Sequence, residues 1–181
     1  RELNGHLLRV YSLKRGSVRI DTTTCSGYWD VTSDGLFQFG FSKDHRPDLP
    51  QVKVVLSTLD PLGMPVATDV VCGNRADDPL YIPAVQRVRE GLQARGMLYI
   101  GDAKMSAVGT RAFVAAQGDF YLSPLTRVQV PEEKLDRYLE PVWEGERALT
   151  SIRRANAAGE RKLIAKGYER EDAMAEEVGE E

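Results

Sequence analysis

The chain contains 181 residues, 42% of them hydrophobic and 28% charged, and this composition predicts one globular domain with appendages and excludes extensive disorder. No apolar run approaches the roughly 18 residues that a membrane helix needs, and the start lacks the pattern of a signal peptide, so we expect a cytoplasmic protein with no membrane partner. The formal net charge of -3 argues against a uniformly basic nucleic-acid-binding protein. It leaves room for a local basic surface, because seven acidic residues lie at or after position 169.

The first part of the chain predicts three strands. Residues 7 to 13 are apolar but too few for periodicity to decide between helix and strand. Residues 17 to 25 alternate polar and apolar side chains and then become rich in threonine, which predicts a strand that carries Asp21 near its end. The runs 51 to 59 and 65 to 72 flank a turn and predict a hairpin, so the three strands should form a meander.

A helix and a buried strand are expected next. Apolar side chains from Leu80 to Leu92 lie along one helical face, with Asp77 or Asp78 at the start and Gly96 at the end. Residues 97 to 100 form a continuous apolar run, which is typical of a strand buried on both faces, and Asp102 follows it closely.

A second helix and a second short strand are expected after Asp102. Ser106 is expected to cap a second helix that runs through Ala116, and residues 120 to 122 predict a last short strand. The order of elements therefore indicates an α/β fold with a mixed sheet, in which any parallel return through a helix is right-handed.

The character of the chain changes near residue 127. Residues 132 to 139 and 144 to 166 are rich in charge and suggest helices, with no further strand signal. We therefore predict a core over residues 1 to 126 and a helical, charged segment over 127 to 181. The basic side chains of this segment are interleaved with glutamates, which favours a solvated helix face. These basic residues are Arg147, Arg153, Arg154, Arg161 and Lys162.

Asp21 and Asp102 are the candidate site residues, because each follows an apolar strand segment and ligands gather at such strand ends in open α/β sheets. Two carboxylates suit a hard cation such as Mg²⁺ or Mn²⁺, which binds oxygen ligands and substrate phosphate. An aspartate after a strand is also a common turn former or helix cap. The pattern alone leaves both interpretations open.

Four stretches carry a resemblance to a known family: residues 20 to 23 (Ile-Asp-Thr-Thr), residues 40 to 51 (Gly-Phe-Ser-Lys-Asp-His-Arg-Pro-Asp-Leu-Pro-Gln), Gly73-Asn74 with Asp77 following, and residues 101 to 106 (Gly-Asp-Ala-Lys-Met-Ser). In these stretches the chain resembles the bacterial insertion-sequence DDE transposases, in the group whose third acid is displaced by a long insertion. The likeness spans residues 18 to about 126. Lys104 is a departure, because relatives often carry glycine there.

The resemblance implies an RNase-H-like fold whose first and fourth strands are adjacent, with Asp21 and Asp102 as the first two catalytic acids and ligands of Mg²⁺ or Mn²⁺. It also implies a third catalytic acid, a Glu after the insertion. Glu140, Glu144 and Glu146 lack the Tyr, Arg and Lys context of that Glu, so we expect no third catalytic Glu in this chain. The first residue, Arg1, and the charged end further suggest a piece of a longer protein, inactive alone.

The loop from Lys43 to Gln51 has two interpretations. Lys43, His45 and Arg46 carry donors suited to DNA phosphates, whereas pairing of Asp44 and Asp48 with them would make a structural salt-bridge loop. Tyr28, Trp29 and Phe37 are aromatic side chains that suit either base stacking or local packing.

The sequence therefore predicts the incomplete catalytic core of a transposase that acts on double-stranded DNA at element ends and targets. The family likeness implies a homodimer of the full-length protein. The alternative is a non-catalytic, transposase-derived module that binds DNA or a partner chain. Cys25 and Cys72 are expected to be reduced, since no zinc-ligand spacing surrounds them.

Overall fold

The structure is a computed structural model that describes residues 2–157 and 159–172. The chain divides into two compact units, Arg1–Leu125 and Thr126–Glu181. Each unit has its own sheet, and each is described by itself below.

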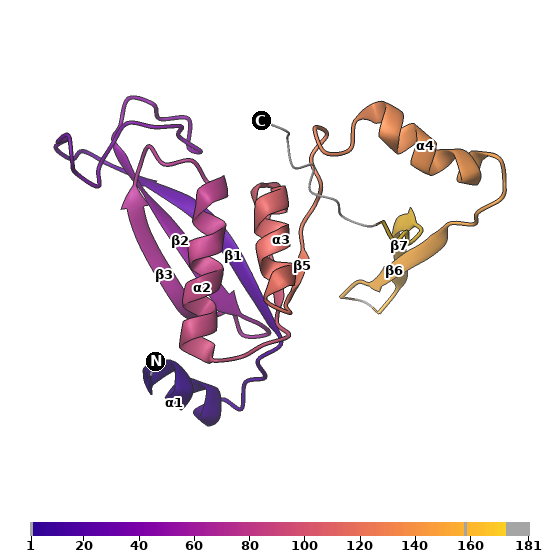
Figure 1. Cartoon of the computed structure of the whole chain (residues 1–181), viewed down its shortest axis with the longest axis horizontal. Helices are drawn as coiled ribbons and strands as arrows, with labels where there is room; N and C mark the ends of the chain where they lie inside the picture. The colour runs from indigo at the N-terminus through magenta and orange to yellow at the C-terminus, as the bar shows by residue number, and fades with distance from the viewer. Residues whose placement is uncertain (1, 158, 173–181) are drawn as a thin grey trace. The chain divides into compact units, whose positions relative to one another are not determined.

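The first unit is built on a five-stranded mixed sheet with the strand order β3-β2-β1-β4-β5 (Figure 1). β2 pairs antiparallel with both β1 and β3, whereas β4 pairs parallel with both β1 and β5. The strands are β1 (Ser17–Ser26), β2 (Gln51–Leu59), β3 (Met64–Cys72), β4 (Leu98–Ile100) and β5 (Phe120–Leu122). The expected RNase-H-like sheet, with a meander followed by two parallel strands, is confirmed by this order.

Helices of the first unit follow the predicted order with adjusted ends. Residues 7 to 13 could not be assigned to helix or strand from the sequence, and the first of them belong to α1 (Glu2–Val10). A 3₁₀ turn, η1 (Asp78–Leu80), precedes α2 (Tyr81–Leu92). α2 ends at Leu92, short of Gly96, because Gln93 adopts a left-handed conformation and its amide donates to the Arg89 carbonyl.

The start of the next helix differs from the prediction. Ser106 belongs to a second 3₁₀ turn, η2 (Ala103–Ser106), and its hydroxyl donates to the Ala103 carbonyl. α3 (Val108–Ala116) begins after it, without a side-chain cap. Asp102 caps η2 instead, by accepting a hydrogen bond from the Lys104 amide. The prediction that Ser106 caps the helix through Ala116 is therefore wrong, because that helix has no side-chain cap.

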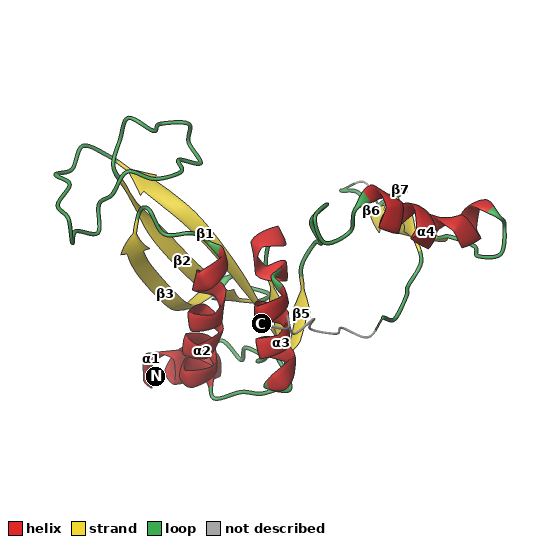
Figure 2. Ribbon diagram, turned by 45° about the horizontal axis from the view of Figure 1, so that its top comes forward, coloured by secondary structure: helices red, strands yellow, loops and turns green. Residues whose placement is uncertain are grey.

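The hydrophobic core lies where α2 and α3 pack on one face of the sheet (Figure 2). Alternate β1 residues, Val18 and Ile20, contribute to it from the sheet, while Arg19 and Asp21 point to the opposite, exposed face. The helices contribute Tyr81, Val85, Val88, Leu92 and Val114, all at most 1% exposed. This packing holds β1 and β4 in fixed positions relative to α2 and α3.

Two backbone segments approach each other closely at Gly40, Gln51 and Gly73, three residues of the stretches that carry the family resemblance. The Gln51 side-chain amide donates to the carbonyls of Phe41 and Gly73, which joins the 36–42 loop to the end of β3. A Cβ at Gly73 would overlap the Gln51 backbone carbonyl, and a Cβ at Gly40 would overlap the Gly73 carbonyl. Glycine is therefore required at both positions for these two backbone segments to approach so closely.

The second unit corrects the prediction of a wholly helical segment. Residues 132 to 139 do lie in a helix, α4 (Glu132–Trp143), but most of 144 to 166 forms an antiparallel hairpin. Its strands are β6 (Thr150–Ala155) and β7 (Arg161–Gly167). Interleaved charges suggested a helix, yet the same pattern suits a strand that is exposed on both faces, as β6 is.

Candidate functional site

Asp21 lies in the middle of β1, and Asp102 follows β4, the parallel neighbour of β1. The β1–β4 register pairs Val18 with Tyr99 and Arg19 with Ile100, where the pairing ends, so Asp21 and Asp102 each come two residues after the last pair. Asp102 keeps an extended backbone, and the Gly101 amide before it still donates to the Leu122 carbonyl of β5.

Tyr81 joins this pair from the first turn of α2. Its ring is fully buried, and its hydroxyl donates to Asp102 Oδ1 at 2.6 Å. The same oxygen accepts from the Lys104 amide at 2.9 Å, so two donors orient the Asp102 carboxylate. Asp102 thus serves as a turn cap and is also held in a defined orientation beside β1.

The surroundings of the Tyr81 phenol raise its pKa. Burial raises the pKa of the phenol, and the hydrogen bond to Asp102 and the charges of Asp102, Asp21 and Asp77 raise it further. The hydroxyl therefore stays protonated and keeps donating to Asp102 across the physiological pH range.

Asp77 differs from the other two carboxylates, because lysines neutralise it. Lys53 Nζ lies 2.5 Å from Asp77 Oδ1, and Lys43 Nζ lies 3.7 Å from Asp77 Oδ2. Burial raises the pKa of Asp77, but the hydrogen bond and charge of Lys53, the charge of Lys43 and a hydrogen bond from Thr22 outweigh it, so the net pKa is lowered. Lys43 is also tied to β1, donating to the Thr22 carbonyl at 2.6 Å.

Asp21 and Asp102 have no such neutralising partner. Asp21 Oδ1 accepts from the Thr22 amide at 2.8 Å, and neither carboxylate forms an ion pair within the described part of the chain. We call these two residues together with Asp77, Tyr81, Lys43 and Lys53 the strand-end site; Asp21 lies on the exposed face of β1, opposite the core face on which β2 carries Lys53. Its two unpaired carboxylates suit one divalent cation that completes its shell with water and phosphate. In residues 2–157 and 159–172, no group of three or more His, Cys, Asp or Glu side chains is placed to share a metal.

The predicted DNA-binding loop is divided between two environments. Lys43 belongs to the strand-end site, whereas Arg46 forms a bidentate pair with Asp48, with contacts of 2.8 and 2.7 Å. The Arg46 hydrogen bond lowers the pKa of Asp48. His45 has a positive φ of 56° and closes a turn, since its amide donates to the Ser42 carbonyl. The pair between Arg46 and Asp48 is the internal ion pair expected for a structural salt-bridge loop.

The aromatic residues before this loop contact one another. Trp29 stacks on Phe37, with ring centroids 4.3 Å apart and an interplanar angle of 26°. This contact favours the local-packing interpretation for both rings. Tyr28 is 89% exposed, and both cysteines are free thiols.

Three members of the strand-end site escaped the site prediction. Lys53 had a readable signal, because a period of two puts it on the same face of β2 as Val55 and Leu59, where it is 6% exposed and needs a partner. Asp77 was taken only as a helix start. Tyr81 gave no signal beyond an aromatic residue in a helix, since its role depends on contact with a residue 21 positions away.

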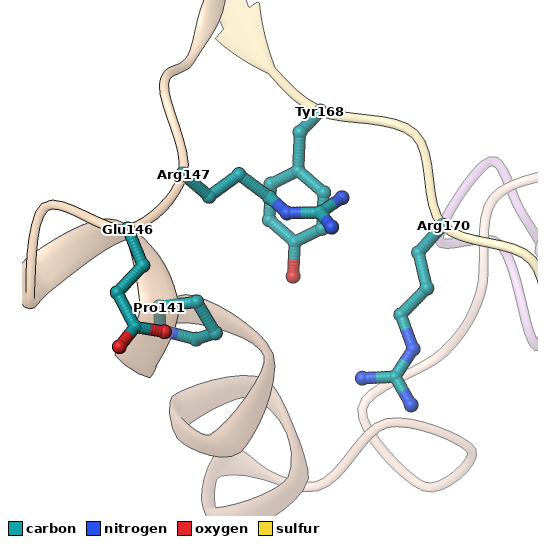
Figure 3. A pocket seen from close by; sticks show the side chains of 5 residues that line it. All are labelled: Pro141, Glu146, Arg147, Tyr168 and Arg170. Atoms are coloured by element: carbon teal, nitrogen blue, oxygen red, sulfur yellow. The ribbon is translucent and has the colours of Figure 1, made fainter.

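Glu140, Glu144 and Glu146 all belong to the second unit. Glu140 lies in α4, Glu144 is the C-cap residue of that helix, and Glu146 lines a hollow of about 310 Å³ with Pro141, Arg147, Tyr168 and Arg170 (Figure 3). The described residues include no helix long and apolar enough to span a membrane.

No known protein-family model and no curated protein matches this sequence. Among solved structures, the chain is similar to the Mos1 transposase paired-end complex with left transposon end, at a TM-score of 0.42 and 10% identity over 80% of this chain and 45% of that chain. It is also similar to a piggyBac transposase synaptic complex with hairpin DNA, at a TM-score of 0.46 and 9% identity over 89% of this chain and 35% of that one. The Mos1 strand transfer complex gives a TM-score of 0.39 and 12% identity over 80% and 46%. The chain spans less than half the length of each of these proteins.

Proposed function

We propose that the first unit is the catalytic core of a DDE-type DNA transposase related to the bacterial insertion-sequence group, and that Asp21 and Asp102 are its first two catalytic acids. One observation carries the proposal. Asp21 in β1 and Asp102 just after the adjacent parallel strand β4 have no ion-pair partner in the described chain, whereas two lysines pair with Asp77. Their charge favours a divalent cation, and the sequence around both acids resembles that family.

Each residue of the strand-end site has a proposed role in cation binding. Asp21 and Asp102 would hold Mg²⁺ or Mn²⁺ through carboxylate oxygens, and Tyr81 would orient Asp102 by donating to Oδ1. When bound, such a cation supplies Lewis acidity toward phosphate oxygens and the attacking hydroxyl. Lys53 and Asp77 would hold the base of the site rigid, since Lys53 is buried and paired.

The proposed reaction has two steps in the full-length protein. Water hydrolyses a phosphodiester at the end of the element and frees a 3′-hydroxyl. This hydroxyl then attacks a phosphorus of target DNA, forming one P–O bond as the target P–O bond breaks. Both steps require a third acid, which we expect outside the residues of the strand-end site. The full-length protein is proposed to act as a homodimer, because paired ends must be cut together.

Lys43, His45 and Arg46 are proposed DNA contacts of unequal strength. Lys43 is 37% exposed beside the carboxylates, so its ammonium can also meet a phosphate oxygen. Arg46 would first have to share the guanidinium that now pairs with Asp48. We therefore place the larger DNA contribution on Lys43.

Cation binding tests this proposal directly. Titration of the protein with Mn²⁺, followed by electron paramagnetic resonance of free Mn²⁺, should reveal one site that Mg²⁺ displaces. The double variant Asp21→Asn/Asp102→Asn should lose at least about 90% of this binding, because the remaining amides carry no charge. The matched control is Asp30→Asn/Asp34→Asn, which removes two exposed carboxylates outside the site and should bind like the wild type. Equal binding by both double variants would refute the metal site.

The alternative is a non-catalytic module derived from a transposase. It is favoured by the observation that Asp102 also caps η2, a role that needs no metal. This alternative predicts that Mn²⁺ binds no more tightly to the wild type than to the Asp21→Asn/Asp102→Asn variant.

A further inference from the structure

The hairpin of the second unit concentrates positive charge in an acidic chain. Residues 150 to 167 contain five basic residues and one acidic residue, whereas the whole chain has a net charge of -3. The single acid, Glu160, lies in the turn, where its carboxylate accepts from the Asn156 side-chain amide and its backbone amide donates to Asn156 Oδ1. The basic residues are Arg153, Arg154, Arg161, Lys162 and Lys166.

These five cations have no hydrogen bond or ion pair to any described side chain or backbone group beyond the ladder of the hairpin itself. All five are exposed. The ladder places them on both faces, since Arg154 pairs with Lys162 in one register position and Ala155 pairs with Arg161 in the next. The cations therefore surround the ribbon and are free to meet an anionic partner.

Two other arginines of the unit, Arg147 and Arg170, have a different role; Figure 3 shows the Arg147 side chain lying over the Tyr168 ring. Arg147 lies over the Tyr168 ring, 5.0 Å from its centroid, and donates to the Glu169 carbonyl. Arg170 lies 4.3 Å from the centroid of the Tyr138 ring and pairs with Asp172. The Tyr168 hydroxyl also donates to the Tyr138 carbonyl of α4. These contacts brace the base of the hairpin against α4 and leave its distal part projecting.

The projecting ribbon also exposes apolar side chains between its cations. Ile152 is 52% exposed, Leu163 46% and Ile164 59%. An isolated two-stranded ribbon is marginally stable in water, so these groups gain stability from a partner surface. A duplex DNA groove admits a two-stranded ribbon, offers phosphates along both rims and presents sugar and base-edge carbon atoms between them.

We infer that the β6–β7 ribbon is a duplex-DNA contact surface, with Arg153, Arg154, Arg161, Lys162 and Lys166 binding phosphates on both rims of one groove. The partner is named from the charge and shape of the ribbon, and its identity as DNA also rests on the proposed function. Phosphate contacts carry no sequence information by themselves, so the ribbon supplies affinity and orientation.

Fluorescence anisotropy of a short labelled duplex, measured in EDTA, tests the ribbon without the metal site. The variant Arg153→Gln/Arg154→Gln/Arg161→Gln/Lys162→Gln should bind the duplex about tenfold or more weakly at low salt, and the dependence of log Kd on log salt should be shallower by about 3 to 4. The matched control, Arg9→Gln/Lys14→Gln/Arg15→Gln/Arg95→Gln, removes the same charge from exposed positions of the first unit and should keep at least the larger part of the salt dependence.

Two outcomes would overturn the inference. One is equal loss in the ribbon variant and the control, which would mean that general charge accounts for binding. The other is displacement of the duplex by polyglutamate at equal charge concentration, which would mean that any polyanion suffices. Near-ultraviolet circular dichroism of both variants checks folding, and a ribbon variant without native signal is replaced by the Arg154→Gln/Lys162→Gln pair. The Asp21→Asn/Asp102→Asn variant should bind the duplex normally in EDTA, so failure of the ribbon and failure of the metal site are distinguishable.

Discussion

The two units handle charge in opposite ways. In the first unit, the charged side chains of Lys53 and Asp119 are buried and form ion pairs with Asp77 and Arg89, respectively. In the second unit, none of the described residues of α4, β6 or β7 is buried, and the hairpin cations have no described partner. A rigid site can therefore be built in the first unit, whereas the second unit offers a charged surface that needs a partner from outside.

The comparison also shows what holds each unit together. The first unit buries a continuous core between helices and sheet, which provides most of the driving force for folding. The second unit depends on local contacts, including the Asn156–Glu160 turn and the stacking of arginines on tyrosines. One tryptophan lies in each unit, Trp29 in the first and Trp143 in the second, so the stability of each can be followed separately.

The largest expected effect comes from a buried ion pair in the first unit. The Asp119 side chain is fully buried, pairs with Arg89 and accepts from the Met97 amide at 3.0 Å. Asp119→Ala should lower the free energy of unfolding by about 3 to 5 kcal/mol, because it leaves the largely buried Arg89 guanidinium without its carboxylate and the buried Met97 amide without its acceptor. Urea unfolding in a Trp143→Phe background, followed by Trp29 fluorescence, measures it.

Asp69→Ala is the control for this prediction. Asp69 lies in β3 and pairs at 2.9 Å with Arg87, which is on α2 like Arg89. Because Arg87 is 50% exposed, the loss of unfolding free energy should stay below about 1 kcal/mol. Similar losses in the two variants would show that burial does not set the value of ion pairs in this unit.

A smaller, pH-dependent effect is expected at Asp77. Because the pKa of Asp77 is lowered on folding, its contribution to stability is present above the unfolded value of about 3.9 and is lost as the pH falls through the folded value. Asp77→Asn should therefore cost about 2 kcal/mol at pH 7. The difference from the wild type should shrink as the pH falls below about 4.

Urea unfolding between pH 7 and pH 3 tests the Asp77 prediction. Asp78→Asn is the control, since Asp78 is 53% exposed and its only ion pair in the described chain is with Lys104 at 3.8 Å. A gap between wild type and Asp77→Asn that stays constant down to pH 3 would contradict the assigned role of the lysines.

The smallest effect is expected in the hairpin. Leu163→Ala should change the free energy of unfolding of the second unit by no more than about 0.5 kcal/mol, because the side chain is 46% exposed. The same change at Leu92, which is 1% exposed in α2, should cost about 2 to 5 kcal/mol in the first unit. Trp143 fluorescence in a Trp29→Phe background follows the hairpin variant. A loss at Leu163 as large as that at Leu92 would reveal a core in the second unit.

The strands and helices of the first unit were predictable because their signals are local. Alternation in β1 and β2 and the apolar face of α2 reflect contacts that repeat along the chain, so the meander and the helix were placed correctly. The hairpin of the second unit was missed because neither of its faces is buried. Without a buried face, the period of two that identifies a strand is absent from the sequence.

The candidate site was predictable only in part. Asp21 and Asp102 could be chosen from their positions after apolar strands and from the family likeness, and they remain a prediction that cation binding must test. Tyr81 and the pairing of Asp77 with Lys53 could not be chosen in this way. Their contacts join residues 21 and 24 positions apart, and such contacts leave no periodic pattern.

The sequence by itself determined the order of the strands and of the helix between them in the first unit, the apolar face of that helix and the two candidate carboxylates, Asp21 and Asp102, because each depends on local periodicity or on a motif. Only the tertiary structure decided which carboxylate is paired with lysines. Asp77 is neutralised because β2 carries Lys53 and the 40 to 51 loop carries Lys43 to the same place, whereas Asp21 and Asp102 meet no cation in the described chain. That difference arises from the packing of distant segments, and it separates a structural ion pair from a candidate metal site.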